Sequence, residues 1–171
     1  GPSCVVYGGD IHEHKLRLIE YNAQKLGLKN VRTLLQNGCT IGQKYAGKAD
    51  RVLVDAPCSG LGVLRHKIDL RWRKQLSDLR TLPALQRRIL ESASQCVKPG
   101  GVLLYSTCTL LQAENEGVVT AFLAQHPEYH LESFLLPGPL GEVAAGQCTL
   151  WPQRLQTDGF FLAKLRKEGA K

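Results

Sequence analysis

The chain has 171 residues and a formal net charge of +7 at pH 7. At this length one domain buries enough apolar surface to fold without disulfide bonds or a structural metal. No apolar run approaches the roughly 20 residues that a transmembrane helix needs, which excludes a membrane-spanning protein.

Six cysteines are spread along the chain without a Cys-x-x-Cys pair, and the five histidines do not cluster with them. A zinc site is therefore unsupported, and we expect no metal. Several of these cysteines lie in apolar, core-like runs. We therefore expect free thiols in a reducing, cytoplasmic environment, or in the nucleolus or mitochondrion if the source is eukaryotic.

The first part of the chain alternates short apolar runs with one amphipathic segment. The runs predict buried strands at residues 4–7, 31–35 and 51–54. Between the first two, apolar side chains recur at helical spacing and predict a helix that Gly27 ends. These side chains are Leu16, Ile19, Ala23 and Leu26. Residues 36–50 are polar and glycine-rich, which predicts a loop with at most one helical turn.

The second part begins with a basic loop and continues with a second amphipathic helix, which a Pro-Gly-Gly sequence at residues 99–101 ends. Its apolar face is Leu82, Leu85, Ile89, Ala93 and Cys96. The remaining expected elements are a strand at 102–105, a helix at 112–124, a strand at 129–134, a surface loop at 137–146 and a final strand at 159–165.

Strands and helices that alternate at these lengths predict an α/β fold with right-handed crossovers and a mainly parallel sheet covered on both faces. We find no repeat, linker or low-complexity tract, so residues 1–171 are expected to form one domain. Ligands bind such sheets at the carboxyl ends of the strands. Three predicted strands are followed there by acidic or reactive side chains: Asp10, then Asp55 with Cys58, then Cys108.

Two thiols and a carboxylate at one rim favour covalent catalysis, because a thiolate is a strong nucleophile and a nearby acid can move protons. The alternative is that Cys58 and Cys108 are small buried apolar side chains. Asp10 is equally open to two interpretations, since an aspartate after a strand can bind ribose hydroxyls or cap the next helix.

Residues 65–88 hold eight Lys or Arg against two Asp. Such a block suits a nucleic-acid partner, although a solvated helix face next to a basic loop has the same composition. Trp72 lies in this block, where it could stack on a base or pack in the core.

Residues 55–60, Asp-Ala-Pro-Cys-Ser-Gly, resemble a motif of the RNA cytosine-5 methyltransferases, and residues 105–109, Tyr-Ser-Thr-Cys-Thr, resemble the Thr-Cys motif of the same family. Further matches are Arg65 with residues 68–72, residues 112–116 and residues 158–165. The resemblance covers nearly the whole chain and is greatest for the bacterial type that modifies small-subunit ribosomal RNA. It implies a Rossmann-like class I methyltransferase sheet.

The resemblance also implies the roles of individual residues. Cys108 would add to carbon 6 of the target cytosine, Asp55 would hydrogen-bond the base near ring nitrogen 3, and Cys58 would assist loss of the carbon 5 proton and release of Cys108. The cofactor would be S-adenosylmethionine, bound by Asp10, Asn37, Asp55 and Pro57. The RNA, expected to be ribosomal, would contact Arg65, Lys67, Arg71 and Trp72.

The sequence departs from the family pattern at its start. The first strand and glycine-rich loop of the family do not precede residue 4, and Asn37 stands where the family usually has an aspartate. We therefore expect an incomplete methyltransferase sheet and weak or absent cofactor binding. An RNA-binding fragment without chemistry is the alternative function. A cysteine hydrolase is disfavoured, because neither His66 nor His126 follows a predicted strand.

Overall fold

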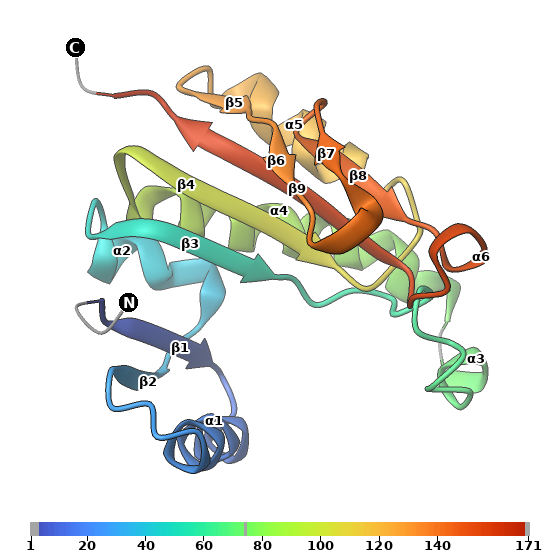
Figure 1. Cartoon of the computed structure of the whole chain (residues 1–171), viewed down its shortest axis with the longest axis horizontal. Helices are drawn as coiled ribbons and strands as arrows, with labels where there is room; N and C mark the ends of the chain where they lie inside the picture. Colours follow the sequence, from blue (N-terminus) through green and yellow to red (C-terminus); the bar gives the residue numbers. More distant parts are fainter. Residues whose placement is uncertain (1–3, 74, 170–171) are drawn as a thin grey trace.

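The computed structural model describes residues 4–73 and 75–169 (Figure 1). Over these residues the strands form three sheets. One pairs β1 (Val6–Asp10) with β2 (Val31–Leu35), and a small one pairs β6 (Phe134–Leu135) with β7 (Glu142–Val143). The main sheet has the order β3 (Ala49–Asp55), β4 (Val97–Thr107), β9 (Phe160–Lys167) and β5 (Tyr129–Leu131), with β8 (Gln147–Leu150) also paired to β9.

Two long helices and several short ones connect these strands. The long helices are α1 (Glu13–Lys25) and α4 (Leu76–Cys96). The shorter ones are η1 (Gly38–Thr40), α2 (Ile41–Tyr45), α3 (Leu70–Arg73), α5 (Glu116–Gln125), η2 (Gly138–Leu140) and α6 (Pro152–Leu155). Within the described part of the chain, none of these helices combines the length and apolar character needed to cross a bilayer.

The main sheet is mixed: β3, β4, β5 and β8 run in one direction, in agreement with the prediction of a mainly parallel sheet, and β9 runs against them. β3 and β4 are parallel, as the long crossover through α4 requires, but β9 runs antiparallel to β4, β5 and β8. Parallel neighbours need a connection of a dozen or more residues, usually helical. The chain between β8 and β9 holds just the four-residue helix α6, so it returns antiparallel.

The predicted burial of both sheet faces is wrong at β3, where the face opposite the helices is exposed. α4 and α5 pack together on one face of the main sheet, behind it in Figure 1. Core residues on that face come from alternate strand positions and from the two helices: Val54, Leu90, Ala93, Leu103, Tyr105, Val118, Val119, Phe122, Phe161, Ala163 and Leu165. On the opposite face Leu53 is 65% exposed. A continuous apolar run does not distinguish a strand covered on one face from a strand covered on both.

The first strand lies two residues later than predicted and is not buried. Val6 and Tyr7 are 48% and 58% exposed, because in the described chain β1 pairs with β2 alone and packs on α1. By contrast, α1 lies close to the predicted position, with Leu16 and Ala23 buried, and β2 has the predicted bounds.

Other boundaries differ from the predictions. α4 starts six residues before Leu82 and contains Pro83, and α5 starts four residues after residue 112. The expected strand at 129–134 is divided between β5 and β6, and the expected loop at 137–146 contains η2 and β7. The sequence did not predict β8 or α6.

Candidate active site

Cys58 and Cys108 lie side by side although they are 50 residues apart in the chain, with their Sγ atoms at 3.2 Å. The parallel pairing of β3 and β4 brings them together. Asp55 is opposite Ser106 in the ladder, and the amide of Ala56 donates to the carbonyl of Ser106 at 3.0 Å. Both chains therefore leave the sheet at one rim, and both thiols are half-buried there. The predicted convergence of the two cysteines is present in the fold.

The pKa values of the two thiols are shifted in opposite directions. A hydrogen bond from Cys58 lowers the pKa of Cys108 to about 7, against the effects of burial and of the nearby Asp55 charge, and the Lys67 ammonium also favours the thiolate. Donating to Cys108 raises the pKa of Cys58 far above its ordinary value, and burial acts in the same direction. Cys108 is therefore the more readily ionised sulfur, and Cys58 keeps its proton.

The loop after Cys58 is fixed between the end of β4 and the start of β9. The amide of Gly62 donates to the carbonyl of Cys108 at 2.9 Å, and the carbonyl of Gly62 accepts from the amide of Gly159 at 2.8 Å. A Cβ atom on Gly62 would overlap the carbonyl oxygen of Gly159. Glycine is needed here for close backbone approach.

Two buried polar side chains, Glu114 and Gln86, contact this loop, and neither is among the predicted site residues. Glu114 is fully buried, and its Oε2 accepts from the amide of Ser59 at 2.9 Å and from Gln86 Nε2 at 2.7 Å. Gln86 also donates to the carbonyl of Pro57 at 2.9 Å. Glu114 lies in the family-like segment 112–116, whereas Gln86 has no sequence signal, because a glutamine on an amphipathic helix is usually solvated.

Asp55 and Pro57 stand at the same rim as the thiols, and both are exposed. The hydroxyl of Ser106 donates to Asp55 Oδ1 at 3.5 Å, which is a long and weak contact. The Asp55 carboxylate is therefore left facing solvent beside Cys108.

Asp10 and Asn37 form a second group at the end of the β1–β2 sheet, held together by the amide of Gln36, which donates to the carbonyl of Asp10 at 3.1 Å. Burial alone would raise the pKa of Asp10, but the amide of His12 and the Lys15 ammonium, 3.2 Å away, lower it. Asn37 Oδ1 accepts from the amide of Cys39. In Figure 1 the β1 and β3 arrows point the same way, although no strand of the described residues pairs across the two sheets.

The predicted RNA contacts lie on the loop after Cys58 and on α3. Arg65, Lys67 and Arg71 are exposed, and Trp72 is 83% exposed. Packing of Trp72 in the core, one of the two interpretations of the sequence, is therefore wrong. Lys74, in the same basic block, lies outside the described residues.

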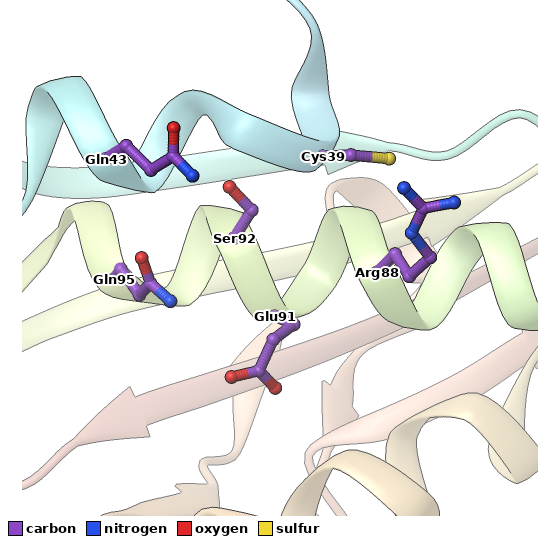
Figure 2. A pocket seen from close by; sticks show the side chains of 6 residues that line it. All are labelled: Cys39, Gln43, Arg88, Glu91, Ser92 and Gln95. Carbon is purple, nitrogen blue, oxygen red and sulfur yellow. The ribbon is translucent and has the colours of Figure 1, made fainter.

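A surface hollow of about 240 Å³ lies where η1 and α2 meet α4 (Figure 2). It is lined by Cys39, Gln43, Arg88, Glu91, Ser92 and Gln95. Ser92 and Gln95 hold α2 on α4 by accepting from the amides of Gly42 and Gly47. None of its lining residues is a predicted site residue, and we interpret the hollow as part of this helix contact.

Comparison with known proteins identifies the family. A family model described as "16S rRNA methyltransferase RsmB/F" matches residues 1–166. The chain belongs to this family. The resemblance inferred from residues 55–60 and 105–109 is thereby confirmed at the level of the family.

Individual RsmB/F relatives are similar over most of the chain. The "Probable ribosomal RNA small subunit methyltransferase B" of Bacillus subtilis is 38% identical over 165 residues, which cover 94% of this chain and 37% of that protein. Ribosomal RNA small subunit methyltransferase B of Thermus thermophilus is 46% identical over 120 residues, covering 70% of this chain and 30% of the relative. The chain thus spans well under half the length of these relatives.

Solved structures agree with the RsmB/F assignment. The crystal structure of NSun6 from Pyrococcus horikoshii with SFG is 33% identical, has a TM-score of 0.82 and is matched over 97% of this chain and 42% of that one. TrmN from Thermus thermophilus is 20% identical and shares the fold, with a TM-score of 0.59. The match covers 98% of this chain and 37% of the TrmN chain. The predicted α/β methyltransferase fold is confirmed.

Proposed function

We propose that this chain carries the catalytic thiols of an enzyme that transfers a methyl group from S-adenosylmethionine to carbon 5 of a cytosine in RNA, with ribosomal RNA as the substrate class. The observation that supports it most directly is the 3.2 Å contact between Cys58 and Cys108 at the rim of a methyltransferase sheet. The names of the relatives, ribosomal RNA small subunit methyltransferases, support the same substrate class.

The residues present fit the nucleoside part of S-adenosylmethionine. Asp10 ends β1 and Asn37 follows β2, so a carboxylate and an amide lie near the ends of two parallel strands, where hydroxyl groups and an adenine edge are commonly bound. Asp55 and Pro57 would border the cofactor at the neighbouring rim. When bound, S-adenosylmethionine supplies the electrophilic methyl group. We assign no residue of this chain to its methionine part.

Cys108 acts as the nucleophile in this proposal. Cytosine is a poor methyl acceptor, and addition of the Cys108 thiolate to carbon 6 makes carbon 5 electron-rich, which divides one difficult step into easier ones. The lowered pKa of Cys108 supports this role, since the thiolate is the reactive form. A base stacked in a helix could not reach the rim, so the target nucleotide is unpaired or flipped out.

Cys58 acts as the acid–base partner. Its proton is held by the negative charge of Cys108 and by the hydrogen bond between the two sulfurs. When Cys108 forms its bond to carbon 6, both of these causes disappear and the pKa of Cys58 falls. Cys58 then releases its own proton to solvent, and the resulting thiolate takes the proton from methylated carbon 5. The electrons of that C–H bond re-form the carbon 5–carbon 6 double bond as the Cys108 thiolate leaves carbon 6.

Asp55 and the basic loop bind the nucleic acid. The exposed carboxylate of Asp55, beside Cys108, would hydrogen-bond the cytosine near ring nitrogen 3 and stabilise the adduct. The cationic side chains of Arg65, Lys67 and Arg71 would contact phosphates, and the exposed ring of Trp72 would stack on a neighbouring base.

Methyl incorporation tests this function. The full-length protein is incubated with tritiated S-adenosylmethionine and ribosomal RNA. Label in the RNA is expected for the unaltered protein and for Cys148→Ala, a control thiol outside the rim, but not for Cys108→Ala. Equal incorporation by the unaltered protein and Cys108→Ala would refute the role of Cys108. No incorporation by any variant, together with salt-dependent RNA binding, would indicate an RNA-binding protein without chemistry.

A further inference from the structure

A two-residue segment between β4 and α5 contacts the loops of both thiols. Glu114 and Asn115 are 0% and 1% exposed and lie in the turns that precede α5. Burying a carboxylate and an amide is unfavourable unless their hydrogen-bonding groups are satisfied. Their partners belong almost entirely to the residues that flank Cys58 and Cys108.

Glu114 holds the Cys58 loop from both sides of the cysteine. Its Oε2 accepts from the amide of Ser59, the residue after Cys58, at 2.9 Å. The same oxygen accepts from Gln86 Nε2 at 2.7 Å, and this nitrogen donates its second proton to the carbonyl of Pro57, the residue before Cys58. One carboxylate oxygen therefore fixes the backbone on each side of the sulfur.

Asn115 holds the Cys108 segment in the same manner. Its Oδ1 accepts from the hydroxyl of Thr107 at 2.6 Å, and its Nδ2 donates to the carbonyl of Thr109 at 3.1 Å. The hydroxyls of Ser59 and Thr109 are 2.7 Å apart and join the two loops directly. The residues before and after each cysteine thus converge on one buried pair of side chains.

We propose that Glu114 and Asn115 are positioning residues that hold the sulfurs of Cys58 and Cys108 at contact distance. The importance of that distance for methyl transfer rests on the function proposed above. The positioning itself does not, because it is a property of two thiols that reagents can measure without RNA or cofactor. A displacement of about 1 Å at a reacting group lowers a rate by roughly 100-fold, so such a pair strongly affects turnover.

Glu114 acts by accepting hydrogen bonds and not through its charge. Its Oε2 receives both donors, while its Oε1 is buried without a hydrogen-bond partner in the described part of the chain. A glutamine can therefore keep both contacts through its single oxygen. Glu114→Gln should preserve the thiol pair, whereas Glu114→Ala removes both contacts.

Phenylarsine oxide measures the pair directly, because it bridges two adjacent thiols and releases one water. Bridging of Cys58 to Cys108 is followed by mass spectrometry in the unaltered protein and in Glu114→Ala, Asn115→Leu, Glu114→Gln and Glu116→Gln. Glu116 is a matched control on the first turn of α5, with a long 3.4 Å contact from the hydroxyl of Thr149. We expect bridging about 10-fold slower in Glu114→Ala and Asn115→Leu, and within about twofold of the unaltered rate in the other two variants.

A second measurement separates positioning from a general loss of stability. The midpoint pH of Cys108 alkylation should rise in Glu114→Ala and Asn115→Leu, because the hydrogen bond from Cys58 is the main cause that lowers the pKa of Cys108. If a variant is less stable but its two sulfurs stay in place, the midpoint pH of Cys108 alkylation should not change. If circular dichroism shows that neither variant is folded, both measurements are repeated on Thr107→Val. This substitution deletes one hydrogen bond to Asn115 and keeps the side-chain shape.

Unaltered bridging and an unaltered midpoint in the folded variants would overturn the inference. Slower bridging with Glu114→Gln behaving normally supports it, even if the unaltered protein transfers no methyl group. In that case the proposed function fails and the positioning role stands. Conversely, methyl transfer that depends on Cys108 but not on Glu114 or Asn115 would retain the function and remove the positioning role.

Discussion

At the scale of single residues, the chemistry depends on an unequal pair of thiols. Cys58 donates a hydrogen bond to Cys108. Two ordinary thiols would each lose a proton near pH 9, but here Cys108 loses its proton at a lower pH and Cys58 at a higher one. The asymmetry comes from their mutual contact more than from any third residue. Removing one thiol should therefore bring the pKa of the other closer to its ordinary value.

Replacing Cys58 tests this dependence. In Cys58→Ala the pKa of Cys108 should rise from about 7 toward the ordinary value of 9.0, because its hydrogen-bond donor is lost while burial and the Asp55 charge remain. Iodoacetamide labelling of Cys108 across pH 6–10, read by mass spectrometry, measures this directly. Cys39→Ala is the control, and an unmoved midpoint in Cys58→Ala would mean that another group sets the ionisation of Cys108.

At the scale of elements, the loop between β3 and α3 depends on Gly62. Gly62→Ala places a methyl group against the carbonyls of Gly159 and Cys108, so the loop must move away from β4 and β9. We expect a loss of roughly 1–3 kcal/mol in the free energy of unfolding, as for other overpacked sites. Urea unfolding measures the loss. Gly169→Ala, where no other described residue lies within 4 Å of the added atom, should be neutral, and equal stabilities of the two variants would contradict this account.

Some elements could be predicted from sequence and others could not, for identifiable physical reasons. β2 and α1 follow local signals, an apolar β-prone run and a helical apolar stripe that ends at a glycine with φ of 68°. β8 carries no alternation, since its four residues are all half-buried, and it is defined by pairing with β9. The early start of α4 places Pro83 inside a helix, where a proline usually indicates a first turn.

The site likewise has features that could be predicted from the sequence and features that could not. Convergence of Cys58 and Cys108 could be predicted, because parallel neighbouring strands end at one rim. The contact between Gln86 and Glu114 could not, because it joins a helix to a turn 28 residues away through tertiary packing alone. The exposure of Trp72 likewise depends on what surrounds α3, which no local pattern encodes.

At the scale of the whole molecule, His126 links three elements outside the site. Its ring bonds Glu91 of α4 at 2.6 Å and Glu128, just before β5, at 3.1 Å, and it stacks on Phe122 of α5. Burial alone would lower the pKa of His126, but the two carboxylates raise it above the ordinary 6.5. The charged ring therefore stabilises the fold below pH 6.5, and this stability is lost as the pH rises through the raised pKa of folded His126.

Removing one carboxylate should make that pH dependence smaller. Glu91→Gln is expected to lower the melting temperature by about 2–4 °C at pH 5.5. A loss of roughly 1 kcal/mol in the free energy of unfolding has this effect in a domain of this size. At pH 8.5, where the ring is less charged, the decrease should be smaller. Differential scanning calorimetry at both pH values gives the comparison, with Glu20→Gln on α1 as control. A deficit that is equal or greater at pH 8.5 would contradict the proposed role of the charge.

The central claim, a covalent bond between Cys108 and the RNA base, is tested most directly by a denaturing gel. The full-length protein is mixed with S-adenosylmethionine and labelled ribosomal RNA at pH 9, where the Cys108 thiolate persists without Cys58. We predict that Cys58→Ala retains RNA through denaturation, because release of the adduct is blocked, and that Cys58→Ala/Cys108→Ala retains none. Equal retention by the two variants, or no retained RNA with Cys58→Ala, would contradict the account.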